Sequence, residues 1–370
     1  MHRPMPNIYQ GPLVDVSNSI FADLPAIART EGKPFMVIGN GHAAWQMAIS
    51  NTLNTDKKVL VLESGRFAFF WGEMASMSGF DVEHVPGSDR GPVDPAVVHE
   101  RLAQDTEHEI QAVLVVLTDT ATGVRNDIKA IRAAIDAADH PALFMVDAIA
   151  SLGCEPYEMD AWGVDLTVAA SQKGLMTPPG IGLVWANDKA LAAHDNANAR
   201  VGYVDWEERM NVDEHYQYYG GTPPIPLLYA LREALDMIAE EGGLEAVWAR
   251  HEVLAGAVWA AVDAWSTPGG LENNIPDPAH RSLATTTVNA GSIDLEQLHL
   301  RTERDTGLTL GFGIGSDNPR FRIGHMGHLN PPMILGTLAT TEATLLAMGA
   351  PLGGSGIAAA TNHIAQALKH

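Results

Sequence analysis

Short apolar segments alternate with amphipathic helical segments through the first half of the chain, and this alternation constrains the fold more than any other feature. One segment, Ala112-Val113-Leu114-Val115-Val116-Leu117, is an unbroken apolar run typical of a parallel strand covered on both faces. The pattern predicts an α/β domain with a mainly parallel sheet. The six apolar segments are 35–38, 58–63, 112–117, 142–147, 164–170 and 181–185.

Residues able to contact a ligand follow five different strands of this predicted sheet. They are Asn40-Gly41-His42, Phe67, Thr120, Asp147 and Lys173. Each has an ordinary explanation on its own, because a glycine turn links many strands to helices, a phenylalanine usually packs and an aspartate often caps a turn. In parallel sheets, however, ligands bind beyond the carboxyl ends of the strands. Five placements at one sheet edge therefore favour a shared binding site.

The lysine in the stretch 164–180 is the most informative of these residues. It directly follows an apolar strand, and the turn Pro178-Pro179-Gly180 comes soon after it. An unpaired ammonium in a dry site is costly, so Lys173 is either a solvent-exposed side chain or a functional amine. A functional amine here can form a Schiff base with a carbonyl-bearing cofactor such as pyridoxal phosphate.

Pyridoxal phosphate needs four further features around such a lysine. These are an acid near the pyridine nitrogen, a phosphate cradle, a flat group on the ring and a donor near the phenolic oxygen. The strand 35–38, the turn 39–42 and the helix predicted for 43–53 form a possible anion site at a helix N-terminus. The residues at the sheet edge meet all four requirements, so we predict a pyridoxal phosphate site.

Six motifs spread over nearly the whole chain carry a resemblance to a known family. The chain resembles the class V aminotransferases of the fold-type I pyridoxal phosphate enzymes, and within them the serine–glyoxylate, alanine–glyoxylate and aspartate–glyoxylate aminotransferases. The motifs are Gly-Asn-Gly-His (39–42), Thr-Ala-Thr-Gly-Val (120–124), Val-Asp-Ala-Ile-Ala-Ser-Leu-Gly (146–153), Ser-Gln-Lys-Gly with Pro-Pro-Gly (171–180), Thr-Pro-Pro (222–224) and Arg-Ile-Gly-His-Met-Gly (322–327).

The resemblance implies transamination of a small amino acid (serine, alanine or aspartate) with glyoxylate or another 2-oxo acid. Lys173 would hold the cofactor aldehyde as an internal aldimine and later move the α-proton. Asp147 would pair with the pyridinium nitrogen, Phe67 would stack on the ring and Thr120 would bond the phenolic oxygen.

The same resemblance assigns the phosphate and the substrate acid. The turn Asn40-Gly41-His42 and Gln172 would hold the phosphate. Tyr219 and Thr222 would reach the phosphate of a neighbouring subunit, which implies a homodimer with shared active sites. Arg322 would bind the substrate α-carboxylate, for which a planar guanidinium is well suited.

The N-terminus departs from the family pattern. The family opens with a Gly-Pro-Thr-Asn-like segment that lines the substrate site, whereas this chain begins Met1-His2-Arg3-Pro4-Met5-Pro6 and has only Gly11-Pro12 nearby. Either the start codon is misplaced or the site is built differently. We predict an N-terminal segment (1–12), a large cofactor-binding domain (13–241) and a smaller C-terminal α+β domain (242–370).

Composition narrows the function further. The formal net charge of −22 argues against nucleic acid and anionic membrane surfaces as partners. No apolar run reaches 18 residues, no signal peptide is recognisable, and Cys154 is the single cysteine. We therefore expect a cytoplasmic protein with no metal site. The alternatives are another class V reaction of the lyase or desulfurase type, and a cofactor-binding relative with little turnover.

Overall fold

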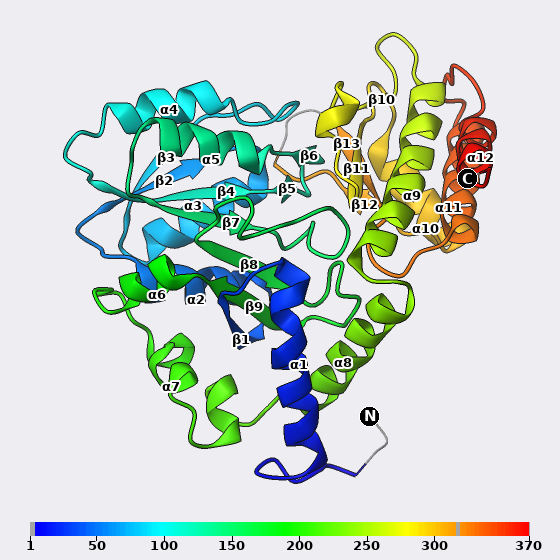
Figure 1. Cartoon of the computed structure of the whole chain (residues 1–370). Coiled ribbons are helices and arrows are strands. Elements are labelled where there is room, and N and C mark those ends of the chain that lie inside the picture. Colours follow the sequence, from blue (N-terminus) through cyan, green and yellow to red (C-terminus); the bar gives the residue numbers. More distant parts are fainter. Residues whose placement is uncertain (1–3, 316–318, 370) are drawn as a thin grey trace.

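A seven-stranded sheet forms the centre of the larger part of the molecule (Figure 1). The computed structural model describes residues 4–315 and 319–369. The strand order is β1-β9-β8-β7-β4-β2-β3, and only β9 runs antiparallel to its two neighbours. The prediction of a mainly parallel sheet is thus confirmed. The strands are β1 (Lys33–Gly39), β2 (Lys58–Leu62), β3 (Asp81–Val85), β4 (Ile110–Val116), β7 (Leu143–Asp147), β8 (Leu166–Ala170) and β9 (Gly180–Ala186).

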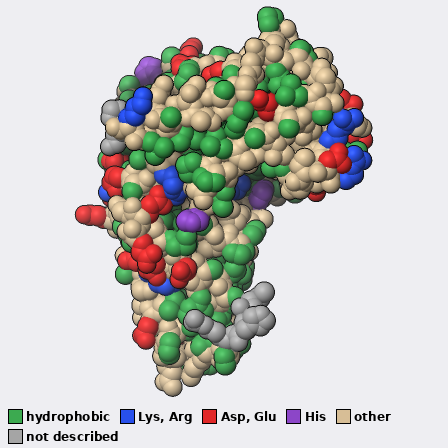
Figure 2. Space-filling view, turned by 90° about the vertical axis from the view of Figure 1, so that its right-hand side faces the viewer, with side chains coloured by type: hydrophobic (Ala, Val, Ile, Leu, Met, Phe, Trp, Pro, Cys, Tyr) green, Lys and Arg blue, Asp and Glu red, His purple; other side chains and the backbone are tan. Residues whose placement is uncertain are grey.

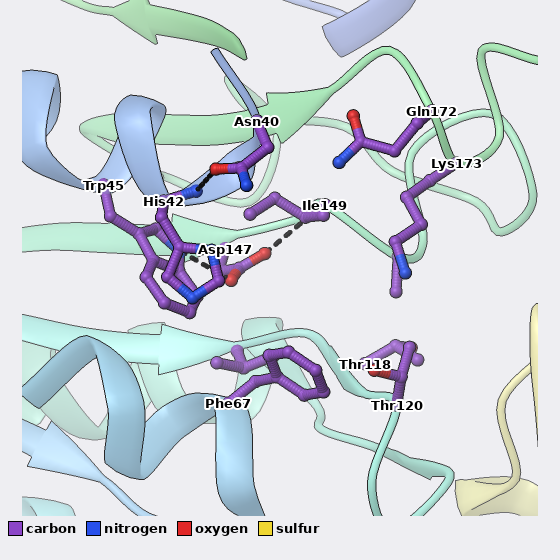
Figure 3. Close-up of a pocket in the computed structure, with 13 residues that line it drawn as sticks. Asn40, His42, Trp45, Phe67, Thr118, Thr120, Asp147, Ile149, Gln172 and Lys173 are labelled. Carbon is purple, nitrogen blue, oxygen red and sulfur yellow. Dashed lines mark hydrogen bonds between the residues drawn. The ribbon is translucent and has the colours of Figure 1, made fainter. Parts of the chain in front are cut away.

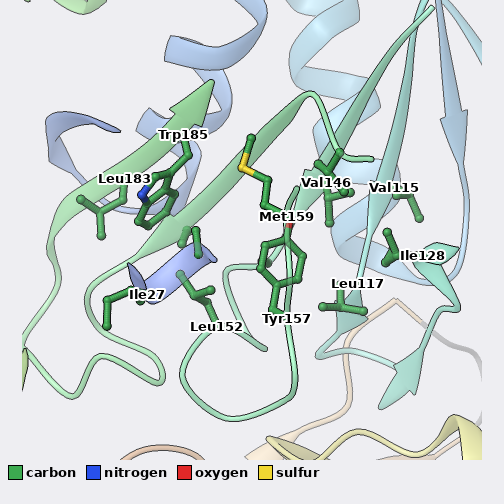
Figure 4. Close-up of a cluster of buried hydrophobic side chains, with 14 of the residues drawn as sticks. Ile27, Val115, Leu117, Ile128, Val146, Leu152, Tyr157, Met159, Leu183 and Trp185 are labelled. Atoms are coloured by element: carbon green, nitrogen blue, oxygen red, sulfur yellow. The ribbon is translucent and has the colours of Figure 1, made fainter. Parts of the chain in front are cut away.

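Helices cover both faces of this sheet, which explains why its central strands are apolar throughout. In β4, Val113 and Val115 pack into one core, whereas Ala112 and Leu114 pack into the core on the opposite face. The first core, part of which is drawn in Figure 4, also receives α1 (Pro12–Ala28), α4 (Pro95–Ala103), α5 (Ile128–Ala137) and α8 (Ile225–Glu240). The second receives α2 (Gly41–Thr52), α3 (Arg66–Met77) and α6 (Asp188–His194).

A smaller antiparallel sheet with its own apolar core lies beside the large one (Figure 1). Its strand order is β10-β11-β13-β12. The elements here are α9 (Leu244–Trp265), β10 (Glu272–Asn273), β11 (Thr285–Asn289), α10 (Leu295–Thr306), β12 (Gly311–Phe312), β13 (Arg320–Gly324), α11 (Pro331–Ala347) and α12 (Gly356–Ala367). Helix α9 joins the two parts, because Leu244 and Val247 pack in the first core whereas residues from Leu254 onward pack in the third. The domain boundary after residue 241 stays a prediction.

Several short elements were harder to foresee. Strand β3 and helix α4 fall in a stretch for which the sequence analysis made no assignment, and β3 is a partly exposed strand at one end of the sheet, with a polar sequence. Helix α3 begins at Arg66, where a distant aspartate binds its first N–H groups. Two short strands, β5 (Thr118–Asp119) and β6 (Val124–Arg125), pair just beyond β4. A short helix, α7 (Glu207–Met210), precedes α8.

Neither a membrane-spanning helix nor a metal-binding cluster is present in the part of the chain that the structure describes. In residues 4–315 and 319–369, no helix is long and apolar enough to cross a membrane. The same residues contain no group of three His, Cys, Asp or Glu side chains that could hold a metal ion. Figure 2 shows one face of the molecule, which is hollowed between its upper and lower parts and has hydrophobic side chains spread across it.

Candidate active site

One cavity collects most of the residues that the sequence placed at the sheet edge (Figure 3). It has a volume of about 170 Å³ and lies at the carboxyl ends of β1, β4, β7 and β8. Strand β1 shares this edge because β9 is antiparallel to both β1 and β8, so that β1 and β8 run in the same direction. The lining residues are Asn40, Gly41, His42, Trp45, Phe67, Val116, Thr118, Thr120, Asp147, Ile149, Ala150, Gln172 and Lys173.

The lysine reaches the cavity from the loop between β8 and β9. Backbone bonds from Met176 N to Lys173 O (3.0 Å) and from Thr177 N to Ser171 O (3.0 Å) close this loop. Burial lowers the pKa of Lys173, and the Arg322 guanidinium lowers it further, although Asp147 opposes both effects. A larger fraction of this amine is therefore neutral and nucleophilic than for an exposed lysine.

The acid opposite the lysine is the last residue of β7. Asp147 is buried, and its carboxylate accepts hydrogen bonds from Trp45 Nε1 (2.8 Å) and from Ile149 N (2.7 Å). Burial raises the pKa of Asp147 to about 7, although these two hydrogen bonds lower it. Because little water reaches the Asp147 carboxylate, a cation in the cavity would stabilise its charged form strongly.

The glycine turn contributes all three of its predicted residues, Asn40, Gly41 and His42, to the cavity lining. Asn40 caps helix α2, and its Oδ1 accepts the hydrogen bond from His42 N (3.0 Å). The His42 imidazole lies tilted against the Trp45 ring, with 4.5 Å between their centroids. A Cβ at Gly41 would meet Ile149 Cδ1 at 2.4 Å, so any side chain at this position would displace the Ile149 side chain. The Gln172 side chain lines the cavity with its Oε1 buried and without a partner.

The position of the aromatic side chain depends on a buried acid that the sequence analysis did not select. Asp119 Oδ2 accepts hydrogen bonds from Phe67 N (2.8 Å) and Ala68 N (3.1 Å), which are among the first N–H groups of α3. Its Oδ1 accepts another from Ala121 N (2.9 Å). This cap starts α3 early enough to bring Phe67 to the cavity wall, next to Thr120.

The predicted carboxylate-binding arginine lies on β13, in the smaller part of the molecule. Arg322 Nη1 donates to Thr120 O (2.9 Å), and Arg322 Nε donates to Phe312 O (2.7 Å). The side chain is partly buried and close enough to Lys173 to influence its pKa. Within residues 4–315 and 319–369, Nη2 has no hydrogen-bond acceptor, so at least this group is available to a ligand.

The two residues expected at a partner's phosphate are not in the cavity of their own subunit. Tyr219 is fully buried, and its hydroxyl donates to Ser17 Oγ (2.8 Å). A contact with another subunit would require this hydroxyl to leave Ser17, so the prediction for Tyr219 gains no support from its placement. Thr222 is exposed in the turn before α8, where a neighbouring molecule can reach it.

Five residues that line the cavity were not predicted from the sequence, and they are Trp45, Val116, Thr118, Ile149 and Ala150. Trp45 follows the glycine turn by one helical turn, a spacing that returns its side chain to the sheet edge. Thr118 lies two residues before Thr120, and Ile149 lies two residues after Asp147. Positions two residues from a selected strand-end residue share its side of the chain, and this spacing could have identified Thr118.

The fold and cavity define an α/β enzyme with a lysine and an acid facing one site. The family model "Aminotransferase class-V" matches residues 35–314. The chain belongs to the class V aminotransferase family, and it is an aminotransferase.

Individual relatives agree with this assignment. The chain is similar to the serine–glyoxylate aminotransferase of Methylorubrum extorquens, with 39% identity over 95% of this chain and 87% of the relative. It is also similar to the L-aspartate–glyoxylate aminotransferase of Paracoccus denitrificans, with 38% identity over 91% and 84%. Among solved structures, the pyridoxamine–pyruvate aminotransferase of Mesorhizobium loti superposes with a TM-score of 0.87, at 26% identity over 99% of this chain and 92% of that one.

Proposed function

We propose that this chain is a pyridoxal phosphate-dependent aminotransferase that transfers the amino group of serine, alanine or aspartate to glyoxylate or another 2-oxo acid. The names of the relatives support glyoxylate as the acceptor. The observation that carries the proposal is the pair of groups facing one cavity, the Lys173 amine and the Asp147 carboxylate.

The residues present fit the cofactor. The cavity lining combines a lysine amine, a buried carboxylate, an aromatic ring, a threonine hydroxyl and the Gln172 amide, whose NH2 group is a donor suited to a phosphate. Asp147 would hold the pyridine nitrogen, Phe67 would cover the ring face, Thr120 would bond the phenolic oxygen, and the turn Asn40-Gly41-His42 with Gln172 would hold the phosphate. When bound, pyridoxal phosphate supplies an aldehyde for amines and a ring that accepts electrons from the substrate Cα.

The chain's own groups then perform three tasks. Lys173 Nζ, whose pKa is lowered by burial, takes a proton from Cα of the amino acid in one half-reaction and supplies a proton to Cα of the 2-oxo acid in the other. Asp147 holds a positive charge at the ring nitrogen, which keeps the ring electron-poor. Arg322 orients the carboxylate that both the amino acid and the 2-oxo acid present, with Nη2 as its available donor.

We also propose that the enzyme is a cytoplasmic homodimer. Thr222 would contribute to the partner's phosphate site, since it is exposed beside α8. Mixing a Lys173→Ala variant with a Thr222→Ala variant tests this sharing, because mixed dimers would contain one site free of both changes. Activity above the sum of the two parents supports the shared site, whereas no recovery despite proven subunit exchange would place Thr222 outside the partner's phosphate site.

The competing class V reactions are less well supported. A desulfurase needs an accessible thiolate nucleophile. Cys154 is instead fully buried, and burial raises its pKa to about 12. The chain therefore lacks the thiol that this alternative requires, since Cys154 is its single cysteine.

Two measurements test the main proposal. Borohydride reduction of the protein as purified, followed by peptide mass spectrometry, should locate a cofactor adduct on Lys173. An adduct on any other lysine would contradict the site. A screen of serine, alanine and aspartate against glyoxylate, pyruvate and oxaloacetate then identifies the substrates, and no turnover with any pair would contradict transamination of these acids.

A further inference from the structure

A buried glutamate that the proposed mechanism does not use connects the cavity wall to the smaller part of the molecule. Glu155 lies in the loop after β7 and its side chain is fully inaccessible to solvent. Its Oε1 accepts three hydrogen bonds, from Thr118 Oγ1 (2.9 Å), Ser282 Oγ (2.7 Å) and Leu283 N (3.0 Å). A carboxylate is expensive to bury, so this one has a specific structural task or a functional one.

The three donors come from two different parts of the fold. Thr118 belongs to β5 and lines the cavity with Lys173 and Asp147. Ser282 and Leu283 lie just before β11, in the smaller part of the molecule. The Ser282 hydroxyl is fully used, since it donates to Glu155 and accepts from Ala284 N (2.9 Å) and Thr285 N (3.3 Å). One carboxylate oxygen therefore fixes the start of β11 against the cavity wall.

Strand β11 pairs with β13, the strand that contains Arg322. Thr287 of β11 is the cross-strand partner of Arg322 of β13. The end of β13 is held by His325, whose N–H groups and ring bond the same segment: His325 N donates to Ala284 O (2.9 Å), Nδ1 lies 2.9 Å from Leu283 O, and Nε2 lies 2.8 Å from Thr286 Oγ1. A shift of the segment 282–286 would therefore move β13.

The other carboxylate oxygen has no hydrogen bond. Glu155 Oε2 is buried without a partner, and the nearest cationic group is Arg125 Nε at 4.0 Å. Arg125 is itself tied to the smaller part of the molecule, because its Nη2 donates to Ala279 O (3.1 Å). Replacement of Glu155 by glutamine would place an amide donor where the chain offers no acceptor, or turn that donor toward the three N–H and O–H groups at Oε1.

We propose that Glu155 is a positioning residue for the proposed reaction: it sets the placement of Arg322 relative to the Lys173 and Asp147 groups. This rests on the proposed function, in which Arg322 holds the substrate carboxylate. Glu155 acts through Ser282, Leu283 and the pairing of β11 with β13, and it does not touch the substrate.

The test uses Glu155→Gln and the milder Ser282→Ala, each purified as the complete enzyme. A 1 Å displacement near a reacting centre can reduce a rate by about 100-fold, so we expect kcat/KM to fall roughly 10- to 100-fold for Glu155→Gln and less for Ser282→Ala. The loss should lie mainly in KM for both the amino acid and the 2-oxo acid. The cofactor adduct on Lys173 after borohydride reduction should be retained.

A matched control separates positioning from general destabilisation. Glu342 is a second buried carboxylate with three donors, Trp265 Nε1 (2.7 Å), Ser355 Oγ (2.8 Å) and Ile357 N (2.9 Å), all within the smaller part of the molecule. Glu342→Gln should lower thermal stability but leave both KM values unchanged. An equal rise of KM in Glu342→Gln would overturn the proposal.

A double-mutant cycle gives the decisive readout. If Glu155 acts through Arg322, then adding Glu155→Gln to Arg322→Ala should change kcat/KM by less than about 2-fold, because the group being positioned is already gone. A full additional loss in that background would show that Glu155 acts through the cavity wall or through stability, and would overturn the proposal. Failure of the proposed function would look different, since the wild-type enzyme would then show no transamination.

Discussion

Removal of the Arg322 guanidinium is the perturbation that best tests the substrate site. Loss of a charged hydrogen-bond partner from a desolvated site costs on the order of 2–5 kcal/mol. Arg322 is only partly buried, and two of its donors are already used by Thr120 O and Phe312 O. We therefore take the lower part of that range, about 2–3 kcal/mol, which corresponds to a roughly 30- to 150-fold fall of kcat/KM for Arg322→Ala.

The assay is steady-state kinetics with the amino donor and the 2-oxo acid varied separately. Both substrates should be affected, because each presents a carboxylate to the same guanidinium. Arg322→Lys should recover only part of the loss, since an ammonium lacks the planar fork. Arg304→Ala is the matched control, because Arg304 is exposed on α10 and pairs with the adjacent Asp305. Normal kinetics of Arg322→Ala with glyoxylate would refute the reasoning.

Three further predictions follow from the buried groups of the site. Folding raises the pKa of Asp147 from 3.8 to about 7, so the folded chain keeps a proton there that the unfolded chain has released, and the stability contributed by this residue is lost as pH rises from about 4 through 7. Asp147→Asn should lose most turnover, because the ring nitrogen would lose its charged partner. Between pH 4 and pH 8 the free energy of unfolding of this variant, measured in urea on cofactor-free protein, should gain up to about 4 kcal/mol relative to wild type. If the difference between the two proteins did not change with pH, the raised pKa of Asp147 would be contradicted. Trp45→Phe removes a hydrogen bond that lowers the pKa of Asp147, so the acidic limb of the kcat profile should move to higher pH, and a fixed limb would show that another group controls it. Gly65→Ala should lower the free energy of unfolding by roughly 1–3 kcal/mol, because its Cβ would lie 2.4 Å from Asp119 Cγ, whereas Gly91→Ala, which meets no atom within 4 Å, should be neutral in the same urea titration.

The sequence was most informative where a local pattern determines the structure. The apolar strands and the residues that end them were predictable, because strand direction in an α/β sheet places all carboxyl ends of parallel strands together. The cavity indeed brings together Asn40, Phe67, Thr120, Asp147 and Lys173. Their roles toward the cofactor stay predictions, since their placement alone does not test them.

What the sequence could not provide depends on contacts between distant residues. The start of α3 is set by Asp119, which lies 52 residues from Phe67, and no local capping residue indicates it. The sequence also did not indicate that Arg322 Nε and Nη1 donate hydrogen bonds to the backbone carbonyl groups of Phe312 and Thr120. The hydrogen bond from the buried Tyr219 hydroxyl to Ser17 joins residues 202 positions apart.

The bond between Arg322 and Thr120 has a consequence for how the enzyme folds. These residues are 202 positions apart, whereas Lys173 lies in a loop between two neighbouring strands, closed by the bond from Ser171 N to Ile181 O. Contacts that close long loops cost more chain entropy and form later than local ones. We therefore expect the lysine loop to form early and the contact with Arg322 to form late, so that a partly folded chain acquires its reactive amine before it can select an acid.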